Sequence, residues 1–324
     1  RQFRFLDLLG RTRTALQRSP GRIPPSRRTL LFEALEPRLL LSSSLPGVDA
    51  VANLIVNRLH DEATASLVTS GLDRSVPRIV GLPGGGNALV GAQGDNHWLI
   101  SGQDTVELNG ERFDDIQYLV GSENSEDTFV LAIGGSLSGG MHGGPGGCDT
   151  LVIEGGHFTD VGYRPTGPDS GAVLLDGNVL HYAGLEPVDD LSAATHKTFD
   201  AATPGDDLLL IADDASADVI SISSLNAGFE THRIHEPSLQ LTVLAGAGAD
   251  SFRFDLLSFD TAITLDGGAG IDTVDLSTRA TGLTVMRFSD GSAALSDGTH
   301  FVRVLNVENF VGAAATIIAQ GIPT

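Results

Sequence analysis

Beyond about residue 90, apolar and polar residues alternate with a period of two. After Asp127, the side chains of Phe129, Leu131 and Ile133 fall on one face of an extended chain. Side chains of a β-strand point alternately to its two faces, so this pattern predicts a strand that opens directly after an acidic turn. Four more aspartates precede apolar pairs at the same spacing: Leu151 and Ile153 after Asp149, Leu209 and Ile211 after Asp207, Phe252 and Phe254 after Asp250, and Val274 and Leu276 after Asp272. Their neighbours Thr150, Val152, Arg253 and Asp275 are predicted to face the other way.

The spacing of these aspartates predicts how the strands are connected. Asp127 and Asp149 are 22 residues apart, and so are Asp250 and Asp272. A fixed step of this size is typical of solenoid coils, which bury their apolar faces by stacking. Asn109-Gly110, Asp176-Gly177 and Asp297-Gly298 lie between them and indicate type I′ hairpin turns. The predicted fold is all-β, with parallel β-helix or solenoid-like rungs and interleaved β-hairpins, preceded by a disordered basic N-terminal segment.

Charge is unevenly distributed along the chain. The whole sequence has a formal net charge of -21, yet residues 1–50 contain nine arginines and only four acidic residues. Within this start, residues 11–28 mix six arginines with three prolines, and residues 1–45 are predicted to be a disordered leader. Residues 46–165 and 166–324 are predicted to be a first and a second β repeat region. Because Arg1 stands where an initiator Met is expected, we expect a piece of a longer protein.

Composition narrows the classes of function. The acidic repeats offer no basic face for phosphates, which argues against nucleic-acid binding. One cysteine, Cys148, excludes an internal disulfide framework and a cysteine-ligated zinc site. Cys148 is interpreted as a small residue of a glycine turn. Lys197 is the one lysine in the chain. No apolar run reaches the length of a membrane span, so no transmembrane segment is expected.

The glycine–aspartate turns suggest a calcium ligand set. Gly267, Gly268, Gly270 and Asp272 fit the calcium-binding nonapeptide G-G-x-G-x-D, and Asp250 on the neighbouring rung offers an opposing carboxylate. Ca²⁺ takes six to eight oxygen ligands, which backbone carbonyls and Asp can supply. The alternative is that Gly and Asp simply build the tight turns between rungs. Both interpretations stay open at this point.

One segment of the leader resembles a known signature. Leu35-Glu-Pro-Arg-Leu-Leu-Leu-Ser42 resembles the motif of the LEPR-XLL family of very long, repetitive bacterial proteins. Segments such as Trp98–Gly102, Gly134–Gly139 and Gly267–Val274 are similar to the repeats of such proteins. The resemblance implies a secreted or cell-surface location and a structural or adhesive, non-enzymatic role. Extracellular polysaccharide or surface components are the partners it implies.

An enzyme is the rival class, because β-solenoids also host polysaccharide lyases and glycoside hydrolases. Acidic pairs occur at Asp114-Asp115, Asp189-Asp190, Asp206-Asp207 and Asp213-Asp214. Adjacent residues of a strand face opposite ways, so the members of a pair cannot act together, and they are interpreted as solvated turn acids. The pair His232 and His235 is interpreted as part of a surface loop rather than a metal site. We therefore expect no catalytic residues.

Overall fold

The computed structural model describes residues 57–58, 61, 74–82, 86–203, 205, 207–213, 218–254, 259–277, 283–312 and 315–319, without the side chains of 202, 203, 213 and 315–319. Within these residues the chain forms 27 β-strands, which belong to two sheets. The predicted all-β fold class is therefore confirmed. The predicted leader, residues 1–45, and the Leu35–Ser42 motif lie outside the described residues.

The first sheet has 15 strands. In spatial order these are β1 (Arg78–Gly81), β2 (Asn87–Val90), β6 (Tyr118–Val120), β8 (Gly140–His142), β12 (Asn178–Ala183), β11 (Ser170–Leu175), β10 (His157–Gly167), β14 (Ala193–Thr203), β18 (Gln240–Gly248), β20 (Ala262–Asp266), β25 (Phe301–Leu305), β24 (Ala293–Ser296), β23 (Leu283–Arg287) and β27 (Ala315–Ala319), while β21 (Ala269–Gly270) pairs with β18.

The second sheet has 12 strands. In spatial order these are β26 (Asn309–Val311), β22 (Thr273–Asp275), β19 (Ser251–Phe254), β15 (Leu208–Asp213), β16 (Val219–Ser224), β17 (His232–His235), β13 (Val188–Asp190), β9 (Thr150–Ile153), β7 (Thr128–Leu131), β3 (His97–Gly102), β4 (Thr105–Leu108) and β5 (Glu111–Asp114).

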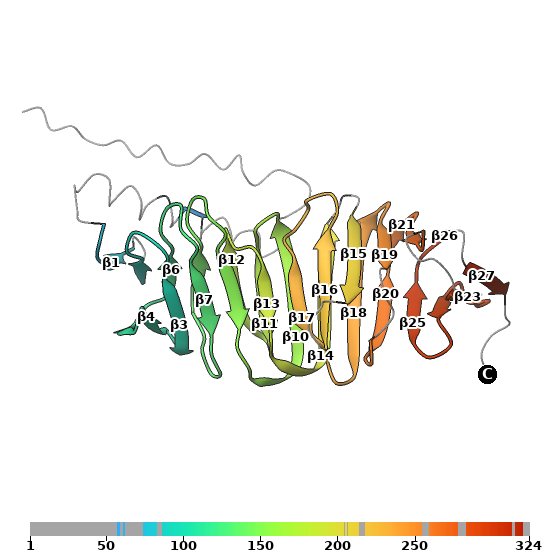
Figure 1. The fold of residues 1–324 in the computed structure, drawn as a ribbon, viewed down its shortest axis with the longest axis horizontal. Helices are drawn as coiled ribbons and strands as arrows, with labels where there is room; N and C mark the ends of the chain where they lie inside the picture. The colour runs from blue at the N-terminus through green and yellow to red at the C-terminus, as the bar shows by residue number, and fades with distance from the viewer. Residues whose placement is uncertain are drawn as a thin grey trace, which may run out of the picture. The chain divides into compact units, whose positions relative to one another are not determined.

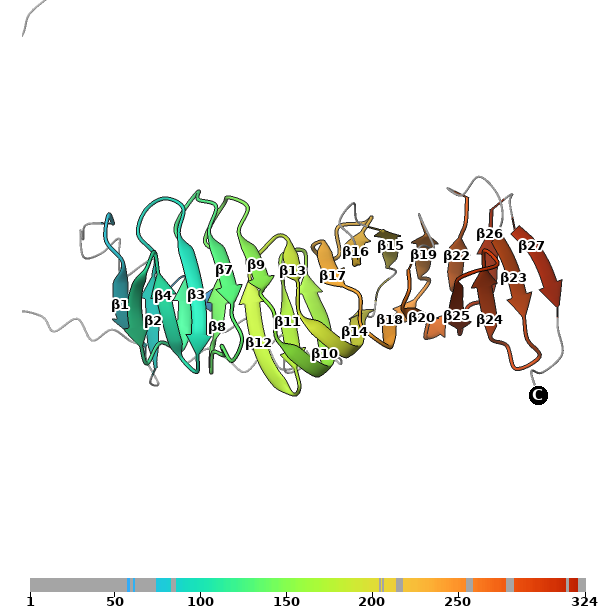
Figure 2. The same cartoon turned by 60° about the horizontal axis from the view of Figure 1, so that its bottom comes forward.

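The two sheets form two layers with one core between them. Neighbouring strands run side by side (Figure 1), and a turned view shows β7, β9 and β13 of the second sheet above β8, β12 and β11 of the first (Figure 2). Phe129 and Leu151 of the second sheet join Met141 and Leu180 of the first in a single apolar cluster. Trp98 is fully buried there and stacks on Phe129 with ring centroids 5.3 Å apart. Burial of these faces is the main force that holds the layers together.

The predicted strand phase is confirmed after all five aspartates except at one residue, Ile133. Every apolar residue predicted to point inward after Asp149, Asp207, Asp250 and Asp272 is buried, and the four predicted outward neighbours are only half-buried. Ile133 is the exception, because 72% of it is exposed. Strand β7 ends at Leu131 and the chain turns at Gly134, which has a φ of 79°, so the alternation stops before Ile133.

The predicted hairpins are present, with one difference in turn type. Asn109-Gly110 joins β4 to β5 and Asp176-Gly177 joins β11 to β12, with positive φ at both residues of each turn. Such angles are those of a type I′ turn. Asp297-Gly298 also lies in a hairpin, between β24 and β25, but only Gly298 has positive φ. Four residues separate these two strands, so a two-residue turn is not needed there.

The described residues all belong to one compact unit, Pro46–Thr324. Strand β10 runs without a break across residues 165 and 166, where the sequence places the border between two repeat regions. That division stays a prediction. Among the described residues, no helix has both the length and the apolar character that a membrane span requires.

Candidate functional site

The five strand-opening aspartates lie inside the protein rather than in solvent. Asp127, Asp149, Asp207, Asp250 and Asp272 each stand one residue before a strand of the second sheet, and none is more than 3% exposed. A buried carboxylate is costly unless hydrogen bonds compensate it. The hydrogen-bond donors that surround these carboxylates therefore determine their role.

Backbone amides of neighbouring turns supply these hydrogen bonds. The N–H of Asp127 donates to Oδ1 of Asp149 at 2.7 Å, and the N–H of Asp250 donates to Oδ1 of Asp272 at 2.9 Å. Asp207 donates to Oδ1 of Asp250 in the same way, at 2.7 Å. We call this arrangement the aspartate ladder, and two further residues extend it: Asn96, whose N–H donates to Asp127 at 2.6 Å, and Glu308, which accepts the N–H of Asp272 at 2.8 Å.

The glycines beside the ladder permit its close backbone contacts. A Cβ at Gly143 would lie 2.0 Å from the carbonyl oxygen of Gly184, and one at Gly267 would lie 2.6 Å from Oδ2 of Asp272. Gly268 has a φ of +85°, and a Cβ at Gly270 would lie 1.6 Å from the carbonyl oxygen of Gly248. Any larger residue would push the stacked turns apart.

The structure thus brings together the residues predicted as a calcium site. Asp250 and Asp272 are neighbours as expected, but the contact between them is a backbone amide on a carboxylate. Asp250, Asp272 and the turn glycines 267, 268 and 270 all contribute to stacking of the turns. Over the part of the chain that the structure describes, no group of three or more His, Cys, Asp or Glu side chains is arranged to hold a metal ion.

Burial makes three of the ladder carboxylates weaker acids than usual. Desolvation raises the pKa of Asp149 to about 7, and the nearby charges of Asp127, Asp95 and Glu126 add to the effect. Burial also raises the pKa of Asp127 and of Asp272, against the opposing effect of their hydrogen bonds. Asp127, Asp149 and Asp272 therefore take up protons at a higher pH than exposed carboxylates do.

A second buried polar group lies between the sheets, and the sequence analysis missed it. Lys197 on β14 and Asp190 on β13 are both fully buried, with Nζ 2.7 Å from Oδ2. The Tyr163 hydroxyl donates to the same Oδ2, and the N–H of Ser192 donates to Oδ1 at 2.7 Å. Asp190 and Asp207 were interpreted as solvated turn acids, and that interpretation is wrong for both, because both are buried. Asp189, the neighbour of Asp190, does face outward, where it meets Arg233 at 3.1 Å.

Tyr182, Glu230 and His232 form a further buried group. The Tyr182 hydroxyl donates to Glu230, and His232 Nε2 lies 3.4 Å from Oε1 of Glu230. Desolvation raises the pKa of Glu230 to about 8 and lowers the pKa of His232 to about 4. The surface-loop interpretation of His232 and His235 is wrong, because both lie on β17 and His232 is fully buried.

Comparisons with known proteins identify no family for this chain. No protein-family model matches the chain, and no curated protein matches it. Its function is therefore inferred from the geometry of its own residues.

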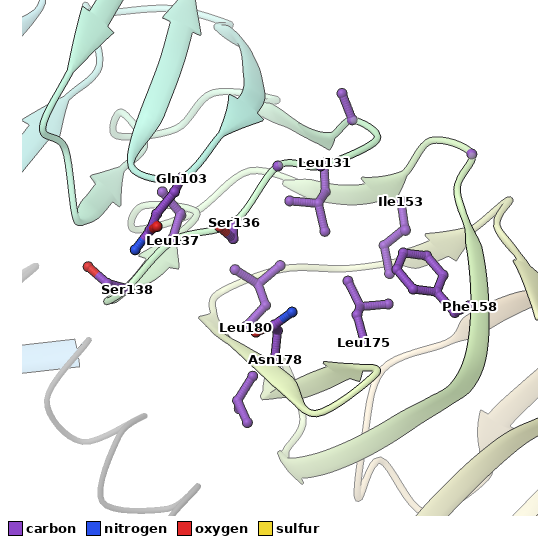
Figure 3. Close-up of a pocket in the computed structure, with 15 residues that line it drawn as sticks. Gln103, Leu131, Ser136, Leu137, Ser138, Ile153, Phe158, Leu175, Asn178 and Leu180 are labelled. Atoms are coloured by element: carbon purple, nitrogen blue, oxygen red, sulfur yellow. The ribbon is translucent and has the colours of Figure 1, made fainter.

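A cavity of about 340 Å³ with a mixed polar and apolar lining opens between the two layers. Leu131 and Ile153 from the second sheet converge there on Leu175 and Leu180 from the first, with the Phe158 ring beside them (Figure 3). Its polar lining consists of amide and hydroxyl side chains: Gln103, Ser136, Ser138 and Asn178. None of its lining residues is titratable, so the cavity has no group for acid–base chemistry.

Proposed function

We propose that this chain is a non-enzymatic structural module of a large secreted or cell-surface bacterial protein, built as a parallel β-solenoid. The observation that carries the proposal is a common register step. Strands β6 and β7, one in each sheet, pair in parallel with β8 and β9, and both pairs are offset by 22 residues. Strands β18 and β19 pair with β20 and β22 at the same offset. One strand from each sheet thus makes one coil, as in a solenoid.

Inserted hairpins explain why other strand pairs depart from the 22-residue offset. Antiparallel strands β4 and β5 follow β3, and β16 and β17 follow β15, in the second sheet. Strands β11 and β12 follow β10 in the first sheet. Each insertion widens a sheet while the next coil still stacks in parallel beside it. This supports interleaved hairpins within a solenoid.

The positions of the carboxylates favour a structural role over a catalytic one. Glycoside hydrolysis uses two carboxyl groups that flank one accessible bond. Here the ladder aspartates accept backbone amides in the interior, and Asp189 and Asp190 face opposite sides of their strand. Since the cavity of Figure 3 also lacks a titratable side chain, a polysaccharide lyase or glycosidase is the less favoured function.

A secreted or surface location follows from the resemblance at Leu35–Ser42, and Cys148 provides its test. This unique cysteine is exposed. A membrane-impermeant maleimide added to intact producing cells is expected to label the chain at Cys148, on the cells or in the medium. Cys148→Ser is the control and should remain unlabelled. Labelling that requires cell lysis would place the chain inside the cell and contradict the proposal.

Calcium is the proposed small ligand of this module, at Asp272. Oδ1 of Asp272 accepts the Asp250 amide, whereas the buried Oδ2 accepts no hydrogen bond from the described residues. A cation that binds only the folded state stabilises it, by about 1.4 kcal/mol at ten times the dissociation constant. Calcium at about 10 mM should therefore raise the melting temperature, given the millimolar affinities of extracellular sites.

Asp272→Asn is the informative variant, because it removes the charge and keeps an oxygen for the Asp250 amide. It should lose the calcium-dependent rise in melting temperature, whereas Asp290→Asn at an exposed turn should keep it. If calcium shifts wild-type melting no more than sodium chloride of equal ionic strength does, the ligand proposal is wrong. The aspartate ladder would then act in stacking alone.

A further inference from the structure

The only lysine of the chain is buried against a carboxylate at the passage from one sheet to the other. Asp190 ends β13 in the second sheet, and the chain reaches Lys197 in β14 of the first sheet seven residues later. Both side chains are fully buried, and Nζ lies 2.7 Å from Oδ2. A lysine is among the residues least often found fully buried. This position therefore calls for a chemical explanation.

The surroundings of this pair are buried and aromatic. The rings of Tyr163 and Phe199 lie 6.4 Å apart, and the ring of His232 meets both edge-on. Taking two charges out of water into such surroundings is strongly unfavourable. Desolvation accordingly lowers the pKa of Lys197. Transfer of one proton from Nζ to the carboxylate gives a neutral amine next to a neutral carboxylic acid, which are the two reactants of amide formation.

We propose that Lys197 and Asp190 condense into an intramolecular amide cross-link. The Nζ lone pair attacks Cγ of the protonated Asp190 and forms a tetrahedral intermediate. Oδ2 then leaves as water, carrying its own proton and one released by Nζ. One C–N bond forms, one C–O bond breaks, and one water is lost. No oxidant, reductant or further reactant is required.

The geometry suits each part of this step. Because Nζ is 2.7 Å from Oδ2, and a C–O bond measures about 1.2 Å, Nζ can be no farther than about 4 Å from Cγ. Holding reactants this close replaces a bimolecular encounter by a local one. The carbonyl oxygen of Ser192 accepts a hydrogen bond from Nζ at 2.9 Å and so orients the amine.

The remaining contacts assist the two oxygens of Asp190. The N–H of Ser192 donates to Oδ1 at 2.7 Å and can stabilise negative charge on that oxygen in the intermediate. The Tyr163 hydroxyl is hydrogen-bonded to Oδ2, where it can relay a proton to the leaving oxygen. Lys197 and Asp190 are thus the reacting residues, and Tyr163 and Ser192 support the reaction.

The unique lysine makes the test direct. Intact-mass measurement of the denatured wild-type chain should give the sequence mass minus one water. An amine-reactive reagent should find no ε-amine in the denatured protein, and trypsin should not cleave after Lys197. A wild-type chain with the full sequence mass and one reactive ε-amine would overturn the proposal. This wild-type readout does not depend on the folding of any variant.

Variants and a time course then test the mechanism. Lys197→Met should have its full sequence mass, whereas Asp189→Ala, at the outward-facing neighbour, should still lose one water. Chain that has never folded, such as chain dissolved from inclusion bodies in denaturant, should keep its ε-amine until it is refolded, since folding brings the groups together. Tyr163→Phe should slow this loss at least tenfold. An unchanged rate in that variant would remove Tyr163 from the mechanism, whereas the same loss in denaturant would contradict a reaction that depends on the fold.

Discussion

Asp127→Ala is expected to lower the free energy of unfolding by about 2–6 kcal/mol, because it leaves two buried backbone amides without an acceptor. Oδ1 of Asp127 accepts the N–H and the side-chain amide of Asn96 at 2.6 and 2.8 Å. Oδ2 accepts the N–H of Ser122 at 2.7 Å and the hydroxyl of Ser125 at 3.2 Å. One side chain thus ties the turn before β7 to the turn before β3. Urea unfolding at neutral pH measures the loss.

A surface aspartate provides the control for this prediction. The side chain of Asp160 is 72% exposed and faces His196 at 3.4 Å, so Asp160→Ala should change the free energy of unfolding by no more than about 0.5 kcal/mol. Asp127→Asn should lie between the two, because it keeps one acceptor oxygen but turns an amide group toward a backbone N–H. If Asp127→Ala were no more destabilising than Asp160→Ala, the aspartate ladder would not stabilise the fold.

Local pattern was sufficient to predict which strand residues face the core. Phe252 and Phe254 alternate with Arg253, and the structure buries the two phenylalanines and pairs Arg253 with Asp275 at 2.9 Å. The alternation of strand faces is a local property, so a single sequence contains it. Ile133 departs from the pattern because the strand ends two residues earlier, and strand ends depend on the surrounding turns.

The aspartate ladder could be predicted only in part. The common 22-residue spacing placed Asp127 beside Asp149 and Asp250 beside Asp272, and their backbone–carboxylate contacts confirm that they are neighbours. Asp207 contacts Asp250 although they are 43 residues apart, because β16 and β17 are inserted between them. The nature of the contact could not be predicted, because the stacking of the turns decides which group meets each carboxylate, and in the structure a backbone N–H meets Oδ1 of Asp149 and of Asp272.

The buried polar groups were missed for a physical reason. Lys, Asp and Glu side chains are mostly exposed to solvent, so residue type alone predicts a surface position for each of them. The local pattern did contain a signal: Lys197 alternates in phase with Phe199 and Ala201, and His232 with Ile234, all of which are buried. Which carboxylate meets each of them depends on pairing between the sheets, and that information is not local.

Raised carboxylate pKa values lead to an unusual dependence of stability on pH. The pKa of Glu230 is about 8 in the folded protein and 4.5 when unperturbed, and that of Asp149 is about 7 instead of 3.8. Between these values the folded state holds protons that the unfolded state has released. The stabilisation is therefore complete below the unperturbed pKa and is lost as the pH rises through the folded value. Folding should be weakest in mildly alkaline solution.

His232 acts in the opposite direction at lower pH. Burial depresses its pKa from 6.5 to about 4, so the folded state binds fewer protons than the unfolded state in this range. Its contribution is present above pH 6.5 and is lost as the pH falls toward 4. Below pH 6.5, protonation of this histidine in the unfolded state thus opposes the stabilisation that the carboxylates provide as the pH falls. The steepest change in stability is expected between about pH 8 and 6.5.

The expected result is that the free energy of unfolding rises by about 2–3 kcal/mol when the pH falls from about 8.5 to 6.5, since each protonating group adds about 1.4 kcal/mol per pH unit. Glu230→Gln should remove most of this slope, because glutamine keeps an oxygen for the Tyr182 hydroxyl but cannot ionise. Glu154→Gln, at an exposed residue, should retain the wild-type slope. Urea unfolding at intervals of half a pH unit measures all three proteins. A flat or rising wild-type profile toward pH 8.5 would show that Glu230 and Asp149 titrate as exposed carboxylates do.

The negative charge of the protein, which is formally -21, adds repulsion as the pH rises and so acts in the same direction. Therefore only the part of the pH dependence of the free energy of unfolding that Glu230→Gln removes reports on the buried Glu230 carboxyl.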